Sequence, residues 1–406
     1  MAAATPDPRS DIVSGQYERW IYPEPIPDLT PWVADNWQWI DPSHSHRLLW
    51  PDRDGVTDLD ILVAGCGANQ AAILAYTNPS ARVVGIDVSG PSLDHHRFLQ
   101  DKHGLANLEL QLLPIEEAGS LGRDFDLIVS TGVLHHMADP VTGLRALADC
   151  LRVDGVVALM LYARYGRIGV EMLQGVFRDL GLEQDQLSVE IVKEALAVLP
   201  DGHPIHSYLE IAPDLQFDAG LVDTFLHGRD RSYTTGDCLE LVSAAGLVFD
   251  DWLLKSPYAV PVTTDNAFHA ALARQPRATQ WSVMERVNFR NGCHFLTCCR
   301  PERPTASYRI DFATDDFLDY APSLRYRCVL DGAVLRRPDW GVDLNASQLA
   351  LVRPLDGRRT IAELIKVAVE DPAFAAILPE RRAQYARELF ASLWERDFLA
   401  MGLRES

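Results

Sequence analysis

The chain has 406 residues, enough for two or three domains, and its hydrophobic content of 47% and charged content of 23% are ordinary for globular proteins. The formal net charge of −20 argues against binding to nucleic acids or anionic lipid surfaces, because both require clustered lysine and arginine. No segment approaches the ~20 apolar residues of a membrane helix, and residues 1–10 lack a basic and apolar signal region. We therefore expect a cytoplasmic protein without nucleic-acid or membrane partners.

Residues 1–55 form a polar leader that is rich in aromatic side chains. Tyr17, Trp20 and Tyr22 lie near its centre, between charged residues and prolines. Such side chains serve equally well in a lid that closes over a ligand and in a flap that fills a hydrophobic groove. The sequence leaves both interpretations open, and Tyr17 and Tyr22 are candidates for substrate or lid contacts.

Two apolar segments after the leader predict a binding pocket at the tip of a parallel sheet. Residues 60–64 indicate a buried strand that runs into a turn with Gly65 and Gly67, and residues 83–88 indicate a second strand that ends near Asp87. The glycines let the backbone approach a ligand closely, and the carboxylate can accept hydrogen bonds from both hydroxyls of a ribose. This pattern predicts an adenosine-containing cofactor.

The residues after the glycine turn argue against a dinucleotide. A dinucleotide-binding turn carries a third glycine, which brings the helix against the strand beneath the pyrophosphate. This chain has Gln70 at that position, preceded by Asn69. A nicotinamide-dependent dehydrogenase is therefore the less favoured alternative.

A further strand ends in a loop that carries two histidines. Residues 124–131 are predicted to form this strand, and His135 and His136 follow it. A helix over 140–151 and a buried strand that ends near residue 160 come next. These elements continue the alternation of strands and helices that builds a doubly wound sheet.

A long helical insertion, roughly residues 163–233, interrupts this alternation. It begins with amphipathic runs at 169–180 and 186–199 and carries clusters of aromatic residues beside charged ones, as ligand pockets do. The candidates for substrate contacts in and beside these clusters are Tyr162, Arg164, Arg229 and Tyr233. For the last cluster, residues 223–233, a network of Asp/Arg salt bridges that pins a loop is an equally good interpretation.

The sheet resumes after the insertion. Residues 247–255 and 294–300 are predicted to be its last two strands, and residues 234–246 a helix that precedes them and ends at a glycine.

The character of the chain changes near residue 304, where prolines mark a linker. Beyond it, Thr360 and Glu363 form a capping box at the start of a helix, and a long amphipathic helix follows over 380–394. We therefore divide the chain into three parts: a leader (1–55), a central domain (56–303) and a C-terminal domain (304–406).

The order of the motifs in the central domain resembles that of class I S-adenosylmethionine-dependent methyltransferases. The glycine turn, Asp87, the Phe-Asp-Leu-Ile strand at 125–128 and the Arg-Val-Asp-Gly turn at 152–155 follow one another as in that family. The chain is most similar to the branch with the quinone-biosynthesis enzymes, on the Val-Leu-His-His loop at 133–136. The resemblance implies an α/β fold with a doubly wound, seven-stranded, mostly parallel sheet whose last two strands form an antiparallel edge. It also implies S-adenosyl-L-methionine as the cofactor and methyl transfer as the reaction.

The resemblance assigns ten residues to the cofactor site. They are Ala64, Gly65, Gly67, Asn69, Gln70, Asp87, Val88, Ile115, Glu116 and Thr131. Three positions depart from the family pattern: Ala64 replaces an acidic residue, Asn69 replaces a glycine, and Pro114 replaces the Asp that usually contacts the adenine amino group. Glu116 is expected to reach that amino group instead, and Ile115 to cover the adenine face.

Methyl transfer needs little from the protein beyond holding the donor carbon and the acceptor atom in near-attack geometry. A base is needed only when the acceptor must lose a proton. His135 and His136 lie in the loop where the family places the donor methyl group, and adjacent residues face opposite ways. We expect His135 to be the nearer of the two and the catalytic base, and His136 to be a structural or substrate-side residue.

No metal site is predicted. Paired histidines such as His44/His46 and His203/His206 have ligand-like spacing, but no set of carboxylates or cysteines completes a site. The seven cysteines show no Cys-x-x-Cys spacing, so neither a zinc ribbon nor a dithiol redox site is indicated.

The C-terminal domain resembles small winged-helix-like modules, on the Leu-Asp-Gly-x-x-Thr-Ile-x-Glu-Leu pattern at 355–364. Such modules recognise peptides in peptide-modifying biosynthesis, and related ones end certain bacterial protein methyltransferases; a docking or dimerisation domain is the alternative. We expect a small molecule as the methyl acceptor. The alternatives are a peptide or protein acceptor recruited by this domain, and a non-catalytic cofactor-binding scaffold. The sequence leaves the oligomeric state open, including a homodimer.

Overall fold

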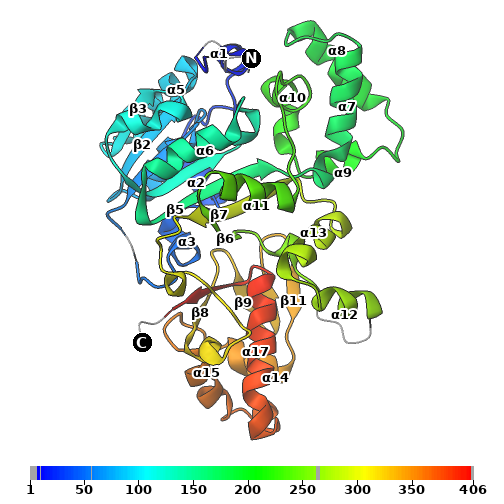
Figure 1. Cartoon of the computed structure of the whole chain (residues 1–406). Helices are drawn as coiled ribbons and strands as arrows, with labels where there is room; N and C mark the ends of the chain where they lie inside the picture. Colours follow the sequence, from blue (N-terminus) through cyan, green and yellow to red (C-terminus); the bar gives the residue numbers. More distant parts are fainter. Residues whose placement is uncertain (1–6, 10, 56, 262–265, 404–406) are drawn as a thin grey trace. The chain divides into compact units, whose positions relative to one another are not determined.

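The computed structural model describes residues 7–9, 11–55, 57–261 and 266–403. These residues fold into two compact units (Figure 1). The first lies within Met1–Gln38, Thr57–Trp252 and Pro276–Glu302, and the second within Trp39–Val56, Leu253–Gln275 and Arg303–Ser406. Residues 39–56 and 253–275 thus belong to the second unit, although the sequence analysis placed them in the leader and the central domain. The functional division at those boundaries stays a prediction.

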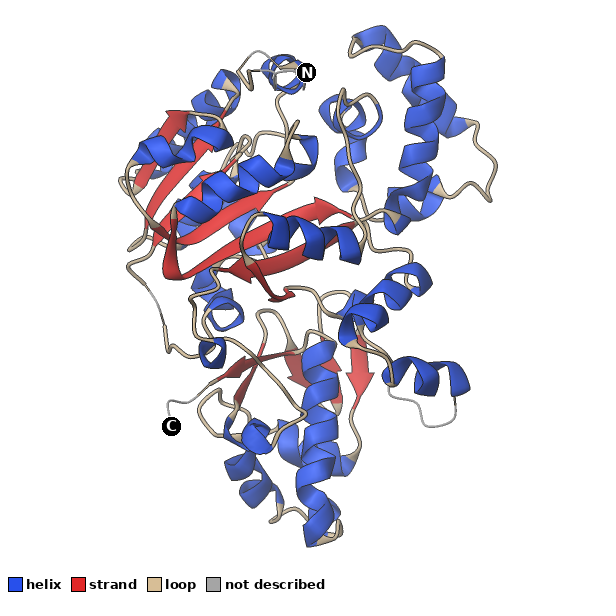
Figure 2. Cartoon of the chain, in the orientation of Figure 1, coloured by secondary structure: helices blue, strands red, loops and turns tan. Residues whose placement is uncertain are grey.

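The first unit is built on the predicted seven-stranded sheet (Figure 2). The strand order is β3-β2-β1-β4-β5-β7-β6, with β7 antiparallel to both of its neighbours and the other pairs parallel. The strands are β1 Asp60–Ala64, β2 Arg82–Asp87, β3 Leu108–Leu112, β4 Phe125–Thr131, β5 Leu151–Tyr162, β6 Val248–Trp252 and β7 Cys293–Cys299. In the central strand Ile61, Leu62 and Val63 are fully buried, because helices cover both faces, and this is why the strand is a continuous apolar run in the sequence.

Helices cover the two faces of this sheet because right-handed crossovers place them on opposite sides as the strand order grows in opposite directions. α4 and α5 pack on β2 and β3, whereas α6 and α11 pack beside β5 and β6 (Figure 1). Outside the insertion, the helices of this unit are α1 Ile12–Arg19, α2 Leu29–Asp35, α4 Gln70–Thr77, α5 Gly90–His103, α6 Pro140–Asp149, α11 Thr235–Ala244 and α13 Arg277–Val287. In the described parts of the chain, none of the helices combines the length and apolar character that crossing a bilayer requires.

The predicted helical insertion follows β5. Its helices are α7 Ile168–Asp179, α8 Gln186–Ala197, α9 Ile205–Leu209 and α10 Asp218–Phe225. They share a small core of their own, which includes Leu173 and Phe177. At the start of the insertion Arg167 is fully buried; its guanidinium lies 3.6 Å from the ring centre of Tyr162 and donates a hydrogen bond of 2.9 Å to Asp230. This contact anchors the insertion to the end of β5.

The second unit contains a two-stranded and a three-stranded antiparallel sheet. Its strands are β8 Ala321–Leu324 with β12 Leu399–Gly402, and β9 Val329–Asp331, β10 Val334–Arg336 and β11 Gly341–Asp343. Its helices are α3 Pro42–Leu49, α12 Ala267–Ala273, α14 Ala346–Val352, α15 Ile361–Ala368, α16 Pro372–Ala375 and α17 Pro379–Glu395. Phe317, Phe374 and Phe390 are fully buried in its core. The predicted capping box between Thr360 and Glu363 is confirmed at the start of α15, whereas the winged-helix-like assignment stays a prediction.

The topology of the first unit places the functional site. The chain runs from β1 towards β3 on one side and from β4 towards β5 on the other, so the strand order reverses between β1 and β4. Such a reversal leaves a crevice at the carboxyl ends of the strands. Ala64, Asp87 and Thr131 end β1, β2 and β4 at this edge.

Candidate active site

A cavity of about 820 Å³ opens at the carboxyl ends of β1, β2 and β4. Its walls come from the glycine turn after β1, the leader, the histidine loop after β4 and the segment that precedes α10. Cavities of this size and mixed lining hold small-molecule ligands. Its two ends differ in character, and each is described in turn.

The glycine turn and Asp87 form one end of the cavity. Gly65 and Gly67 have φ values of +73° and +53°, and a Cβ atom on Gly65 would lie only 2.5 Å from Cγ2 of Val133. The Asp87 carboxylate accepts hydrogen bonds from the backbone N–H groups of Gly67 (2.8 Å) and Ser89 (2.9 Å), which fix its orientation. Burial raises the pKa of Asp87 to about 6, although these two N–H groups act in the opposite direction.

The structure gathers nearly all of the predicted cofactor residues around this end. Those that line the cavity are Gly65, Gly67, Asn69, Gln70, Asp87, Val88, Ile115, Glu116 and Thr131. Ala64 does not line it: the residue is the fully buried end of β1 and pairs with Ile86 of β2. Its place as a cofactor contact is therefore corrected to a position inside the sheet.

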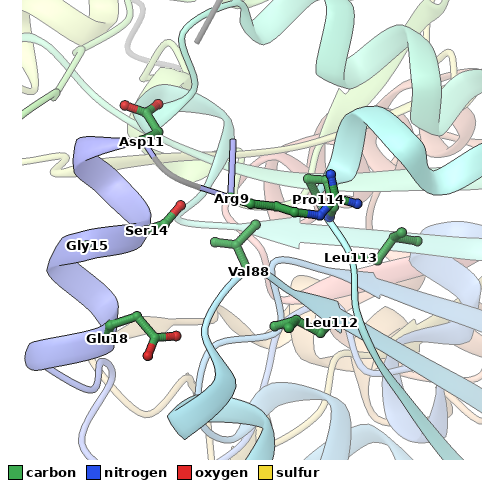
Figure 3. A pocket seen from close by; sticks show the side chains of 9 residues that line it. All are labelled: Arg9, Asp11, Ser14, Gly15, Glu18, Val88, Leu112, Leu113 and Pro114. Carbon is green, nitrogen blue, oxygen red and sulfur yellow. The ribbon is translucent and has the colours of Figure 1, made fainter. Parts of the chain in front are cut away.

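A smaller cavity of about 290 Å³ adjoins this end (Figure 3). It shares Val88 and Leu113 with the main cavity and is closed on one side by α1. Arg9 and Pro114 both line it (Figure 3), and Pro114 takes the position where the methyltransferase family has an Asp. Pro114 offers no hydrogen-bonding side chain, whereas Glu116 lines the main cavity and is half-buried, which raises its pKa.

Three tyrosines and Asp214 line the other end of the cavity, and a second carboxylate, Asp223, binds two of these tyrosines from outside the lining. The phenol of Tyr17 donates a hydrogen bond of 2.7 Å to Asp223, the phenol of Tyr162 donates one of 3.1 Å to the same carboxylate, and the phenol of Tyr22 donates one of 2.8 Å to Asp214. Asp223 is 1% exposed, and sequence reasoning did not single it out. The only indication of Asp223 in the sequence was its place in the cluster of aromatic and charged residues at 223–233.

The two histidines differ from the expectation. His135 is fully buried beneath the cavity, with its ring 3.9 Å from that of Tyr162, and burial holds its pKa well below the usual value. His136 lines the cavity, and its Nδ1 donates a hydrogen bond of 2.9 Å to the carbonyl of Arg229. Because a carbonyl only accepts, this bond places the proton on Nδ1 and leaves the Nε2 lone pair without a partner among the described residues. The nearer histidine is therefore His136, not His135.

The predicted substrate residues of the insertion separate into two groups. Arg229 lines the cavity and pairs with Asp11 at 2.6 Å. Arg164 is exposed, outside the cavity, and donates a hydrogen bond to the carbonyl of Ser232 at 3.3 Å. Tyr233 is buried, also outside the cavity, and its backbone N–H donates to the carbonyl of Tyr162. The ion pairs of Arg229 with Asp11 and of Asp230 with Arg167 agree with the salt-bridge interpretation of cluster 223–233, while Arg229 also lines the cavity, so both interpretations stay open.

In the part of the chain that the structure describes, two groups of side chains bring possible metal ligands within 4.8 Å of one another: His135, His136 and Asp230, and His136, Asp223 and His227. The hydrogen bonds argue against the second group as a metal site. His227 Nδ1 accepts from the N–H of Arg229 at 2.9 Å, so its proton is on Nε2, the atom that would face an ion. In the first group the Asp230 carboxylate already pairs with the buried guanidinium of Arg167. We assign no metal to this site.

A protein-family comparison matches residues 62–157 to a family described as "Methyltransferase domain". The chain carries a class I S-adenosylmethionine-dependent methyltransferase domain. The matched residues include the glycine turn, Asp87 and the histidine loop. The methyltransferase is an enzyme that uses S-adenosyl-L-methionine, as the motifs predicted.

Relatives of this methyltransferase include an uncharacterized protein, syc1184_c, of Synechococcus sp., 28% identical over 91% of this chain and 92% of its own. A tRNA U34 carboxymethyltransferase of Desulfotalea psychrophila is 31% identical over 27% of this chain and 33% of its own. A Ubiquinone biosynthesis O-methyltransferase of Neisseria meningitidis is 30% identical over 26% of this chain and 45% of its own. The chain thus spans less than half of these two relatives with named activities.

Among solved structures, PKMT2 from Rickettsia typhi superposes with a TM-score of 0.62 at 14% identity, over 90% of this chain and 75% of that one. The same protein in complex with AdoHcy gives a TM-score of 0.60. At this identity the likeness shows a shared fold.

The residues of the methyltransferase fit its cofactor. The glycine turn has no room for side chains at positions 65 and 67. It lies beside Asp87, which lines the cavity, and Ile115, 5% exposed, offers an apolar side chain at the same end. Asp87 would hold the ribose, and Val88 and Ile115 would enclose the adenine. Gln70 is held by Thr131, whose hydroxyl donates to it at 2.8 Å.

Proposed function

We propose that the methyltransferase transfers a methyl group to a small molecule bound at the tyrosine end of the cavity. The observation that carries this proposal is the continuity of the cavity: the same walls enclose Asp87 at one end and Tyr17, Tyr162 and His136 at the other. A small acceptor bound among the tyrosines would therefore lie beside the reactive part of the cofactor. When bound, the cofactor supplies a sulfonium methyl group that an acceptor atom displaces in line.

His136 is the base in this proposal. An acceptor such as a hydroxyl, an amine or an acidic carbon gives its proton to Nε2 of His136 as it bonds to the methyl carbon and the carbon–sulfur bond breaks. The carbonyl of Arg229 holds the imidazole in the required tautomer through Nδ1. Asp223 fixes the phenols of Tyr17 and Tyr162, so their oxygens are oriented before an acceptor binds.

Transfer of a labelled methyl group tests the proposal. Full-length protein and S-adenosyl-L-methionine with an isotope-labelled methyl group are incubated with a bacterial lysate that has been separated into low-mass and polypeptide fractions. We expect the label in a product of the low-mass fraction. Label in polypeptides alone would support the alternative, a peptide or protein acceptor recruited by the C-terminal domain. Binding of S-adenosylhomocysteine without transfer to either fraction would contradict both.

A further inference from the structure

Side chains of Asn69 and of α5 bind the backbone of residues 24–29 of the leader. Asn69 binds two groups at once: its Nδ2 donates to the carbonyl of Glu24 at 2.8 Å, and its Oδ1 accepts from the N–H of Ile26 at 2.9 Å. On α5, His95 donates to the carbonyl of Ile26 at 3.0 Å. Two further residues of α5 bind the next part of the leader: Lys102 donates to the carbonyl of Pro27 at 2.7 Å, and His103 accepts from the N–H of Leu29 at 3.1 Å.

The sequence of this segment suits binding by side chains. Prolines occupy positions 23, 25 and 27, so only every second residue carries a backbone N–H. The N–H of Ile26 lies in the middle of the segment and is the donor that Asn69 accepts. An extended segment with alternate prolines therefore satisfies its backbone groups through side chains rather than through a neighbouring strand.

Asn69 departs from the family's glycine, and its contacts explain the departure. The residue precedes α4 at the N-cap position, where an asparagine side chain normally binds an N–H of the first turn. Its side chain makes no such bond. It is 4% exposed, and its amide binds the leader instead.

The bound leader forms part of the cavity wall. Pro23, Glu24, Pro25, Ile26 and Pro27 all line the main cavity. The leader also lies directly on the cofactor turn, since a Cβ atom on Gly67 would be 2.9 Å from Cδ of Pro23. Tyr17 and Tyr22 reach the tyrosine end of the cavity from the same segment.

We propose that Asn69 is a positioning residue for the leader. By binding Glu24 and Ile26 it docks the leader as a wall of the cavity, so the methyltransferase retains its cofactor. Loss of this clamp releases the leader, and the cofactor then dissociates faster. The expected change in cofactor dissociation rests on the proposed function, whereas the expected release of the leader does not require a cofactor.

Substitutions of Asn69 in the full-length chain test the proposal. Asn69→Gly and Asn69→Ser both remove the two bonds to the leader, but serine is also a good N-cap residue for α4. If Asn69 only capped α4, Asn69→Ser would behave like the wild type. We expect both variants to release S-adenosylhomocysteine about tenfold faster, the effect of about 1.4 kcal/mol. We also expect faster trypsin cleavage after Arg19 in both, with or without cofactor.

Two further variants lie on α5, away from the glycine turn, so they test the proposal even if a substitution of Asn69 disturbs the fold. His95→Ala removes a leader contact from α5, and we expect it to accelerate trypsin cleavage after Arg19 as well. Arg97→Ala, on the exposed part of the same helix, serves as the matched control and should leave both rates unchanged. Wild-type rates in Asn69→Ser and His95→Ala would overturn the proposal. Absence of S-adenosylhomocysteine binding in the wild type would instead count against the cofactor assignment, while the cleavage rates would still report on the clamp.

Discussion

Asp87 is a carboxylate with a raised pKa at the position that we expect to hold the ribose of the cofactor. Burial raises its pKa to about 6, so the group becomes protonated as the pH falls through that value. A protonated carboxyl accepts fewer hydrogen bonds from ribose hydroxyls. We therefore predict that affinity for S-adenosylhomocysteine is constant above about pH 7 and falls by up to about tenfold per pH unit below about 6. Calorimetric titration across this range measures the effect.

The matched variants for this prediction are Asp87→Asn and Asp94→Asn. The first cannot ionise, so it should bind weakly with no pH dependence near 6. The second changes an exposed carboxylate on the neighbouring α5 and should keep the wild-type profile. A wild-type affinity that does not change between pH 7 and pH 5 would contradict the role of Asp87.

The two adjacent histidines give a second prediction at this scale. His136→Ala removes a histidine that lines the cavity and whose Nε2 has no partner among the described residues. General-base catalysis typically contributes 10²–10⁴-fold, so we predict a loss of about that size in methyl transfer. Affinity for S-adenosylhomocysteine should change little. His135→Phe keeps a flat ring against Tyr162 and should retain transfer within about tenfold, because neither ring nitrogen of His135 has a partner among the described residues. The reverse order of effects would restore His135 as the base.

Local sequence patterns predicted the residues at the cofactor end of the cavity. The roles of the other residues of the site depend on contacts between positions far apart in the sequence. Glycines with a nearby carboxylate carry their signal within some twenty residues. Asp223 has no such signal, because its partner Tyr17 lies 206 positions away. The leader-binding role of Asn69 likewise depends on residues 43 and 45 positions away, so the sequence showed only that a family glycine was missing.

At the scale of elements, the leader and the glycine turn restrict each other. Gly67 has a positive φ and no room for a side chain, since a Cβ atom would lie 2.9 Å from Pro23 and 3.1 Å from the carbonyl oxygen of Tyr22. Gly104, at the end of α5, has a similar φ of +64°, but none of the described residues comes within 4 Å of its Cβ position. Alanine at position 104 therefore tests the effect of backbone strain alone, whereas alanine at position 67 adds the effect of crowding by the leader.

We predict different outcomes for alanine at these two glycines. Gly67→Ala should weaken S-adenosylhomocysteine binding by at least about tenfold, because the turn or the leader must move. Gly104→Ala should cost about 1–2 kcal/mol of unfolding free energy, the price of a left-handed alanine, and leave binding unchanged. Calorimetry and urea unfolding measure the two effects. Equal losses of binding in both variants would show that strain alone, not contact with the leader, limits position 67.

The element boundaries were predictable where a periodic apolar pattern and a cap coincide, as in the capped helix α15 that begins after Thr360. The set of chain segments that form the second unit could not be predicted from such local patterns. Residues 39–56 and 253–275 join it through contacts with segments far along the chain, such as the backbone bond from Leu403 to Pro51. No local pattern in either segment indicates that partnership.

At the scale of the whole molecule, the second unit depends on one buried carboxylate. Asp397 is fully buried with a φ of +63°; it accepts hydrogen bonds from the backbone N–H groups of Lys255 and Ser256 and pairs with Arg325 at 2.7 Å and Arg337 at 3.2 Å. These contacts join two of the three chain segments that make up this unit, 253–275 and 303–406. Replacing a buried carboxylate with such partners by a neutral side chain is costly, because the guanidinium groups lose the charge that offsets their desolvation.

Asp397→Asn tests this dependence, since asparagine tolerates the left-handed backbone conformation. We predict a loss of about 3–5 kcal/mol in the unfolding free energy of the second unit, measured by urea unfolding with tryptophan fluorescence. Asp339→Asn is the matched control, because Asp339 also pairs with Arg337 at 3.0 Å but its side chain is 61% exposed. A surface pair of this kind contributes at most about 1 kcal/mol, so the control should unfold almost as the wild type does. Equal stabilities of the two variants would mean that the backbone bonds to Lys255 and Ser256, rather than the charge, hold this part of the unit together.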